Sequence, residues 1–203
     1  MNIPAPEIVK ASKKLSWLLR HGASEAGVRL DAAGWAKIDD VLAALKMDRE
    51  RLDAAVTQNN KARFTVDGDR IRANQGHSSD VVDLAAVEAS WIMFTGPGPL
   101  WHGTGIEPLP GIAEQGLLPQ ARTHVHMVDA KDSVAGKRAA VDVLLEISVS
   151  RMLSRKCRIF RSENGVILAR HVPKECIVDV IPMSVKARSQ LPELRRIMGL
   201  DQN

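Results

Sequence analysis

Histidine, arginine and glycine residues are concentrated between Leu100 and Met127, and these residue types could together bind an anion. His102, His124 and His126 are three of the six histidines of the chain, and Arg122 lies among them. Glycines separate the short apolar runs of this stretch, and glycine turns leave backbone amides accessible to a ligand. Arginine keeps its charge at every relevant pH, and its planar fork matches phosphate oxygens in pairs. The stretch therefore predicts a cleft for an anionic ligand, with phosphate favoured over an acyl group.

The elements that must position these side chains follow from the apolar runs and the glycines. We expect a strand that ends at Trp101, a glycine-containing turn over His102 to Gly105, and a short helix over Ile112 to Gln115. Gly116 is expected to close that helix, and a second strand is expected to begin at Thr123. This layout places polar side chains at strand ends.

A second pair of basic side chains lies near the start of the chain. Apolar residues at near-helical spacing predict a first helix from Ile8 to Arg20, with Gly22 as its stop signal after His21. Cations at a helix C-terminus also complement the helix dipole, so their position alone does not separate a structural role from a functional one.

Three helices followed by a hairpin are expected in the first half of the chain. A second helix follows Gly34 and Trp35, and a third begins at Asp48, a residue type that caps helices. Asp67-Gly68 is a strong hairpin signal. The alternation in this hairpin predicts an apolar face of Phe64, Val66, Ile71 and Ala73 and a basic face of Arg63, Arg70 and Arg72. Three helices and a β-ribbon are typical of a winged helix.

The second half of the chain shows a different pattern after TGPGP at 95–99, where we place a boundary near residue 95. Strands are expected over Val141–Val149, Val166–Leu168 and Ile177–Pro182, and a helix over Ala130–Ala140. The run Arg151–Arg161 carries five cations and no acid, which fits either a solvated face or a phosphate-binding segment.

Several classes of protein are excluded or disfavoured. The chain has no GxGxxG or GxxxxGK[ST] loop, no nucleophile elbow, and no CxxC pair. His124 and His126 would share a strand face, but no carboxylate or cysteine cluster completes a metal site, so we expect no metal. Apolar runs are too short to span a bilayer. A formal net charge of +4 favours an anionic partner. Because Cys157 and Cys176 are in no metal or redox spacing and no signal peptide is recognised, we expect a cytoplasmic protein with reduced thiols, and we expect it to be a monomer.

Six segments in register resemble the RNA 2′-phosphotransferases of the KptA type. The resemblance rests on SKKLSWLLRHG (12–22), the segment from Leu30 to Trp35, RIRANQGHS (70–78), LWHGT (100–104), GLLPQARTHVHM (116–127), and RSENGVIL leading to VP (161–173). It implies an α+β fold with a winged-helix RNA-binding lobe over residues 1–94 and an ADP-ribosyltransferase-like, NAD-binding lobe over 95–203.

The resemblance also implies a reaction in two steps, with NAD and a tRNA-like RNA bearing an internal 2′-phosphate. The 2′-phosphate attacks the anomeric carbon of the nicotinamide ribose and expels nicotinamide, giving an ADP-ribosylated RNA. The ribose 2″-hydroxyl then attacks the phosphorus and releases 2′-hydroxyl RNA and ADP-ribose 1″,2″-cyclic phosphate. The nucleophiles belong to the substrates, which agrees with the absence of a nucleophile motif, and the protein would position groups and stabilise charge.

Matching motif to motif assigns roles to individual residues. The implied catalytic residues are Arg20, His21, Arg72 and Arg122, with His21 as the candidate for proton transfer. The implied NAD-binding residues are His102, Gly103, Thr104 and His126. The implied RNA- or phosphate-binding residues are Arg70, His77 and Arg138.

The sequence departs from the usual family pattern at four positions, Trp101, Val128, Ile167 and Ala169, which bear on affinity and rate. Two other functions stay open: an ADP-ribosyltransferase that acts on a nucleic-acid terminal phosphate or a protein, and a non-catalytic winged-helix nucleic-acid-binding protein. The first would accumulate the ADP-ribosylated product, and the second would ignore NAD.

Overall fold

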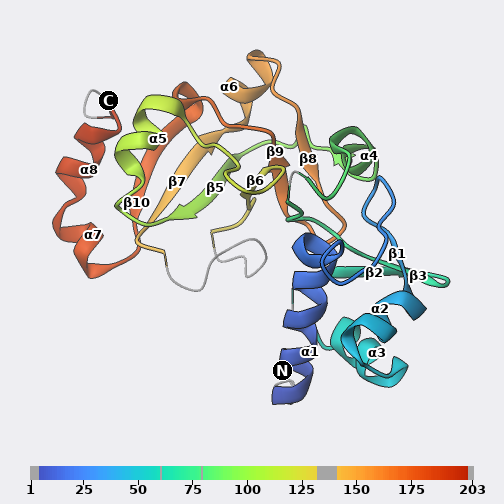
Figure 1. The fold of residues 1–203 in the computed structure, drawn as a ribbon. Helices are drawn as coiled ribbons and strands as arrows, with labels where there is room; N and C mark the ends of the chain where they lie inside the picture. Colours follow the sequence, from blue (N-terminus) through green and yellow to red (C-terminus); the bar gives the residue numbers. More distant parts are fainter. Residues whose placement is uncertain (1–4, 60, 79, 132–140, 201–203) are drawn as a thin grey trace. The chain divides into compact units, whose positions relative to one another are not determined.

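The structure, a computed structural model, describes residues 5–59, 61–78, 80–131 and 141–200. Over these residues it is a mixed α and β fold with eight α-helices and sheets of antiparallel strands (Figure 1). The coarse α+β expectation is therefore confirmed. The chain divides into two compact units, one from the N-terminus to Trp91 with Ala121–Thr123, and one of Ile92–Gln120 with the residues from His124 on.

Unit 1 contains four α-helices, one π-helical turn and a three-stranded sheet. The elements are α1 (Pro6–Trp17), η1 (Leu18–Gly22), β1 (Ala36–Lys37), α2 (Ile38–Leu45), α3 (Arg49–Thr57), β2 (Phe64–Asp67), β3 (Arg70–Ala73) and α4 (Leu84–Ala89). The strands are ordered β1-β3-β2, all antiparallel. The second and third predicted helices and the hairpin are confirmed, whereas the short β1 and α4 were not predicted.

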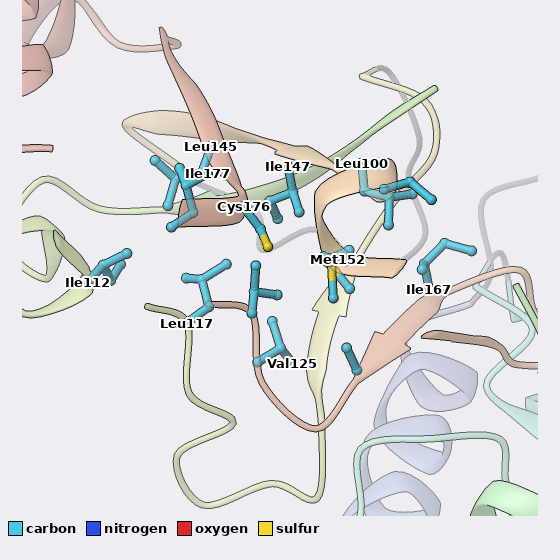
Figure 2. Packing of buried hydrophobic residues seen from close by; sticks show 14 of the residues in the cluster. Leu100, Ile112, Leu117, Val125, Leu145, Ile147, Met152, Ile167, Cys176 and Ile177 are labelled. Carbon is cyan, nitrogen blue, oxygen red and sulfur yellow. The ribbon is translucent and has the colours of Figure 1, made fainter. Parts of the chain in front are cut away.

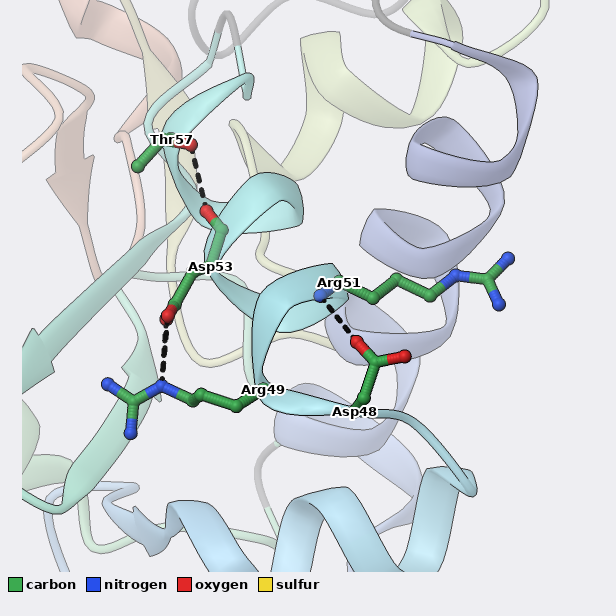
Figure 3. Close-up of polar contacts among 5 residues, drawn as sticks. All are labelled: Asp48, Arg49, Arg51, Asp53 and Thr57. Atoms are coloured by element: carbon green, nitrogen blue, oxygen red, sulfur yellow. Dashed lines mark hydrogen bonds and ion pairs between the residues drawn. The ribbon is translucent and has the colours of Figure 1, made fainter.

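Helix α3 begins where the sequence predicted. The Asp48 carboxylate accepts a hydrogen bond from the Arg51 backbone N–H at 2.7 Å, which satisfies one of the free amides of the first turn (Figure 3). Arg49, the first residue of α3, donates to the carboxylate of Asp53 one turn later, at 2.9 Å. The Thr57 hydroxyl donates to the Asp53 carbonyl at 2.8 Å. These hydrogen bonds join successive turns of α3 and stabilise the helix.

The end of the first helix differs from the prediction. Gly22 is not a left-handed stop, because the helical backbone continues through a π turn to Ala23, and the left-handed residue is Gly27, with φ of 69°. Gly22 is required for another reason. A Cβ atom there would lie 2.3 Å from the Trp17 ring, so only glycine lets that ring pack against η1.

The hairpin is confirmed, but its two faces are not divided as predicted. Val66, expected on the apolar face, is exposed near the tip, and Arg72, expected on the solvated face, is only 5% exposed. Val66 lies beyond the reach of the core, which is built from Leu15, Leu18, Leu19, Ile38, Leu52, Phe64 and Ile71. Arg72 is covered because it packs on Trp35.

Unit 2 contains two antiparallel sheets. One has the order β10-β7-β5, and the other has the order β4-β8-β9-β6. The elements are β4 (Ile92–Met93), β5 (Pro99–Thr104), α5 (Leu109–Gln115), β6 (Val125–Met127), β7 (Val143–Ser148), α6 (Val149–Ser154), β8 (Ile159–Arg161), β9 (Ile167–Ala169), β10 (Ile177–Pro182), α7 (Val185–Ser189) and α8 (Leu191–Ile197), with a 3₁₀ turn η2 (Lys174–Cys176). An isolated bridge between Trp101 and Val128 links the two sheets.

A hydrophobic core joins the elements of unit 2 (Figure 2). Leu100 of β5 and Ile147 of β7 pack with Met152 of α6, Ile167 of β9 and Cys176 of η2. All five side chains are at most 1% exposed. Burial of residues from both sheets and from the helices fixes the strand ends where the candidate site residues lie.

Two predictions for unit 2 are corrected by the structure, and the cationic run agrees with the solvated-face alternative. The turn expected over His102–Gly105 is wrong for its first three residues. His102, Gly103 and Thr104 continue strand β5 and pair in register with β7. The second strand begins at Val125 and not at Thr123. The long cationic run divides into α6 and β8, where Met152, Ile159 and Phe160 are buried and most of the cations are exposed.

The other strands agree with the predictions. Strand β10 has the predicted bounds, β7 and β9 lie within a residue or two of theirs, and Gly116 ends α5 with φ of 77°. The helix predicted over Ala130–Ala140 lies largely outside the described residues. None of the helices that the structure describes is long and apolar enough to cross a membrane.

Candidate functional site

Four basic residues predicted to be catalytic come from three separate segments of unit 1. Arg20 and His21 lie on η1, Arg72 lies on β3, and Arg122 lies on the return segment 121–123. We call these four residues the cationic cluster.

Backbone hydrogen bonds at His77 and Ser78 tie two of these segments together. The Ser78 N–H donates to the Arg20 carbonyl at 3.0 Å, and the Thr123 N–H donates to the His77 carbonyl at 3.1 Å. Ser78 and Arg122 also form an antiparallel bridge. The loop after β3 therefore holds η1 on one side and the return segment on the other.

The Arg20 side chain is half-buried among other cations. Its Nε and Nη2 atoms are inaccessible to solvent and have no hydrogen-bond partner among the residues that the structure describes. Burial first, and the charges of Arg63 and Arg122 after it, lower the Arg20 pKa to about 10. The guanidinium therefore stays charged at neutral pH.

His21 is held by a hydroxyl group. Its Nδ1 lies 2.7 Å from Ser78 Oγ, which leaves Nε2 for a substrate. Burial, followed by the charges of Arg20 and Arg122, lowers the His21 pKa, while Asp80 opposes this effect. The imidazole is consequently neutral at pH 7 and can accept a proton.

Trp35 organises the arginines of β3. The Arg72 guanidinium carbon lies 4.7 Å from the centroid of the Trp35 ring, and that of Arg70 lies 5.1 Å from it. Arg70 also pairs with Asp67 at 3.1 Å and approaches Asp31 at 4.0 Å, all at an exposed position. Arg72, at 5% exposure, is the more buried of the two cations.

His77 is a neutral, buried neighbour of the cationic cluster. Its side chain is 1% exposed, and neither ring nitrogen has a hydrogen-bond partner among the described residues. Burial and the charges of Arg20, Arg72 and His21 lower its pKa to about 4. Gly34 makes room for it, since a Cβ atom at that position would lie 2.8 Å from His77 Nε2.

Three residues that support the cluster received no role from the sequence. These are Ser78, which holds His21; Trp35, on which Arg72 stacks; and Arg63, whose charge lowers the pKa of Arg20. Ser78 and Trp35 lie inside segments on which the family resemblance rests. Those motifs therefore included them, but nothing about a serine or a tryptophan at these positions predicted a role at the site.

The predicted NAD-binding residues lie together in unit 2. His102 Nδ1 lies 2.8 Å from the His126 carbonyl oxygen, across the two sheets. Because a carbonyl can only accept, Nδ1 of His102 carries the proton, and its Nε2 is an acceptor in the neutral ring. Gly103 and Thr104 follow on β5, opposite Leu144 and Val143.

The residues around His102 differ in how open they are to a ligand. A Cβ atom at Gly103 would lie 2.8 Å from Val141 Cγ1, so a side chain there would clash. The adjacent Trp101 has a solvent-inaccessible Nε1–H with no hydrogen-bond acceptor among the described residues. The half-exposed His102 ring offers an acceptor to a polar ligand, whereas Gly103 packs against Val141 and Trp101 Nε1 is closed to solvent.

One predicted substrate-binding residue is not placed by the structure. Arg138 lies outside the described residues. Among the residues that are described, no group of three or more histidine, cysteine or acidic side chains could hold a metal ion.

Comparison with known proteins gives a consistent family. The model of the RNA 2′-phosphotransferase, Tpt1/KptA family matches residues 6–171. A probable RNA 2′-phosphotransferase of Burkholderia lata is 40% identical over 187 residues, which covers 88% of this chain and 94% of that protein. Proteins with the same description from Acaryochloris marina and Pseudomonas aeruginosa are 37% and 41% identical, covering 86% and 80% of this chain and 98% and 91% of theirs. The chain belongs to the RNA 2′-phosphotransferase, Tpt1/KptA family.

Proposed function

We propose that this protein is an NAD-dependent RNA 2′-phosphotransferase with a winged-helix RNA-binding lobe over residues 1–94 and an ADP-ribosyltransferase-like NAD-binding lobe over 95–203. The observation that carries this proposal is the cationic cluster. Arg20 is held in a half-buried position beside like charges, with two nitrogens that lack a partner among the described residues. Such an arrangement is costly unless an anion completes it. A 2′-phosphate on RNA is the anion that the family membership supplies.

The arginines of the cluster would bind and orient the RNA 2′-phosphate. Arg72 is fixed on Trp35 and Arg20 on η1, so the phosphate would meet preorganised donors. NAD, consumed in the reaction, supplies the anomeric carbon that the phosphate attacks, and the reaction passes through an ADP-ribosylated RNA. The same arginines would then stabilise the charge on phosphorus when the ribose 2″-hydroxyl attacks and the RNA leaves.

His21 would move the proton in that second step. Its lowered pKa keeps the ring neutral at pH 7, and Ser78 fixes it by Nδ1. In the tautomer in which Nδ1 donates to Ser78 Oγ, Nε2 would accept the proton of the attacking hydroxyl, which makes that oxygen a better nucleophile, and the departing RNA 2′-oxygen would take up a proton to give the 2′-hydroxyl. His102, Gly103, Thr104 and His126 would hold NAD, with His102 Nε2 as a hydrogen-bond acceptor.

The experiment that tests the proposal is incubation of the pure protein with a short RNA that bears one internal 2′-phosphate, with and without NAD. We expect 2′-hydroxyl RNA, nicotinamide and ADP-ribose 1″,2″-cyclic phosphate only when NAD is present. Accumulation of an ADP-ribosylated RNA would instead favour a transferase that lacks the second step. Nucleic-acid binding without any NAD-dependent change would favour a non-catalytic binding protein.

The roles of Arg20 and Arg122 are tested in the same assay. We expect Arg20→Ala and Arg122→Ala to reduce product formation at least a hundredfold, because each removes a charge that the transition state requires. Arg49→Ala is the matched control, since Arg49 is an exposed arginine of α3 paired with Asp53. Near-normal turnover by either cluster variant, with the folded state verified by circular dichroism, would falsify the role of that residue.

A further inference from the structure

A pocket of about 590 Å³ lies in unit 1 between helices α1 and α3. Its size falls within the range of small-molecule sites. Residues Ser12, Lys13 and Trp17 line it from α1, and Asn59 and Arg63 line it from the segment after α3. Arg20 and His21 also line it, so the pocket shares its wall with the cationic cluster.

The charge of this α1/α3 pocket is entirely positive. Lys13, Arg20 and Arg63 line it together with His21, and none of the described residues that line it is acidic. Burial lowers the Arg63 pKa, as expected for a cation that has lost part of its solvation without gaining a carboxylate. The charge therefore favours an anionic occupant.

Arg63 is fixed in position by a short hydrogen-bond chain. Its Nη1 donates to Asn59 Oδ1 at 2.9 Å, and Asn59 Nδ2 donates to Ser12 Oγ at 3.0 Å. The chain ties Arg63 to α1 and so aligns a guanidinium beside the pocket before any ligand binds. Such preorganisation reduces the entropy lost on binding.

Trp17 gives the α1/α3 pocket a flat apolar wall. The side chain is 43% exposed, which is unusual for so large an apolar group, and part of its ring packs against Gly22 of η1. Because this packing fixes one part of the ring, the exposed remainder is a rigid surface on which a planar group could stack.

We propose that the α1/α3 pocket binds the RNA nucleotide next to the one that carries the 2′-phosphate, with its base stacked on Trp17 and its backbone phosphate held by Arg63 and Lys13. A nucleotide is the ligand that combines a planar base with a negative charge. The placement rests on the proposed function, since Arg20 and His21 belong to both the pocket and the cationic cluster. The cluster would take the 2′-phosphate, and the pocket would take the neighbouring nucleotide.

The test measures binding of a fluorescein-labelled RNA hexamer without any 2′-phosphate, in the absence of NAD, by fluorescence anisotropy at several salt concentrations. We expect Trp17→Ala to weaken binding about tenfold, the effect of losing one base–aromatic stack, whereas Trp17→Phe keeps most of the affinity. Arg63→Gln should weaken binding and reduce the salt slope by about 0.7, as loss of one phosphate contact does for single strands. Arg49→Gln, the matched control on α3, should leave both unchanged.

Equal affinity of the wild type, Trp17→Ala and Arg63→Gln for the hexamer would overturn the pocket assignment. That result leaves the proposed function untouched, because turnover of a 2′-phosphorylated RNA is measured separately with NAD. Loss of affinity in the Trp17→Ala and Arg63→Gln variants, with wild-type protein that shows no NAD-dependent turnover, would show that the pocket binds RNA, but it would refute the proposed function and the placement next to a 2′-phosphate. Thermal melts of Trp17→Phe and Trp17→Ala separate a binding defect from a folding defect.

Discussion

The Arg20 guanidinium lies half-buried beside two other guanidinium groups, those of Arg63 and Arg122. Burial and like charge both disfavour its ionised form, and its lowered pKa measures that cost. An anion bound at the cluster would offset the repulsion between like charges and stabilise the ionised form. The electrostatic repulsion that destabilises the charged Arg20 in the free protein is therefore relieved when the cluster binds a phosphate.

His77 makes protein stability depend on pH. Its pKa is about 4 in the folded protein and near 6.5 when unfolded, so the unfolded chain binds the proton first as the pH falls. Stability should then decrease as the pH falls from about 6.5 towards 4, by at most about 1.4 kcal/mol per pH unit. Urea unfolding at pH 7, 6 and 5 measures this slope, and His77→Asn should flatten it.

His171, an exposed histidine of unit 2, provides the control for that experiment. The His171→Asn protein should keep the slope of the wild type. If His77→Asn and the wild type lose stability in parallel between pH 7 and 5, another group is responsible and His77 does not remain neutral in the folded state.

The sequence predicted candidate catalytic residues but not the residues that position them. Arg20, His21 and Arg122 were predicted from motifs, and the structure places them in one unit. Ser78 and Trp35 received no role, because a hydroxyl on a ring nitrogen and an indole under a guanidinium depend on contacts between residues 57 and 37 positions apart. Only the fold brings such residues together.

At the scale of elements, the packing of η1 depends on the absence of a side chain at Gly22. We expect Gly22→Ala to destabilise the protein by about 1–3 kcal/mol, because the new Cβ would lie 2.3 Å from the Trp17 ring. Urea denaturation gives the free energy of unfolding, and the shift of tryptophan fluorescence reports the displaced ring.

Gly111→Ala is a matched control, because Gly111 lies within α5 and a Cβ atom there would have no neighbour within 4 Å. That variant should be neutral or slightly more stable, since alanine is the better helix former. If both alanine variants were equally stable, the tight packing of Trp17 on Gly22 would not exist in solution.

The elements that the sequence predicted best are those that local chemistry determines. Asp48 caps α3 with its own carboxylate, and Asp67-Gly68 makes a turn that few other pairs allow. Strand β5 was predicted to end too early because its glycine suggested a turn, whereas pairing with β7 keeps residues 102–104 extended. The short β1 exists only because β3 pairs with it, so its own residues gave no signal.

At the scale of the whole molecule, an anion should stabilise the folded chain. Any ligand that binds only the folded state raises its stability with concentration. We expect inorganic phosphate to raise the melting temperature of the wild type more than chloride does at equal ionic strength. Arg122→Gln should lose most of this difference, and Arg49→Gln should keep it. A phosphate effect equal in all three proteins would indicate a general salt effect and no specific anion site.

The return segment 121–123 affects which parts of the gene must stay together during recombination. The chain leaves unit 1 after Trp91, builds part of unit 2, and comes back to deliver Arg122 before leaving again. A contiguous N-terminal piece would carry Arg20, His21 and Arg72 but not Arg122 or its bridge to Ser78. Exchange of a single gene segment between relatives would therefore join a fourth cation to three with which it had not coevolved. The cluster can therefore be inherited intact only when both segments come from the same relative.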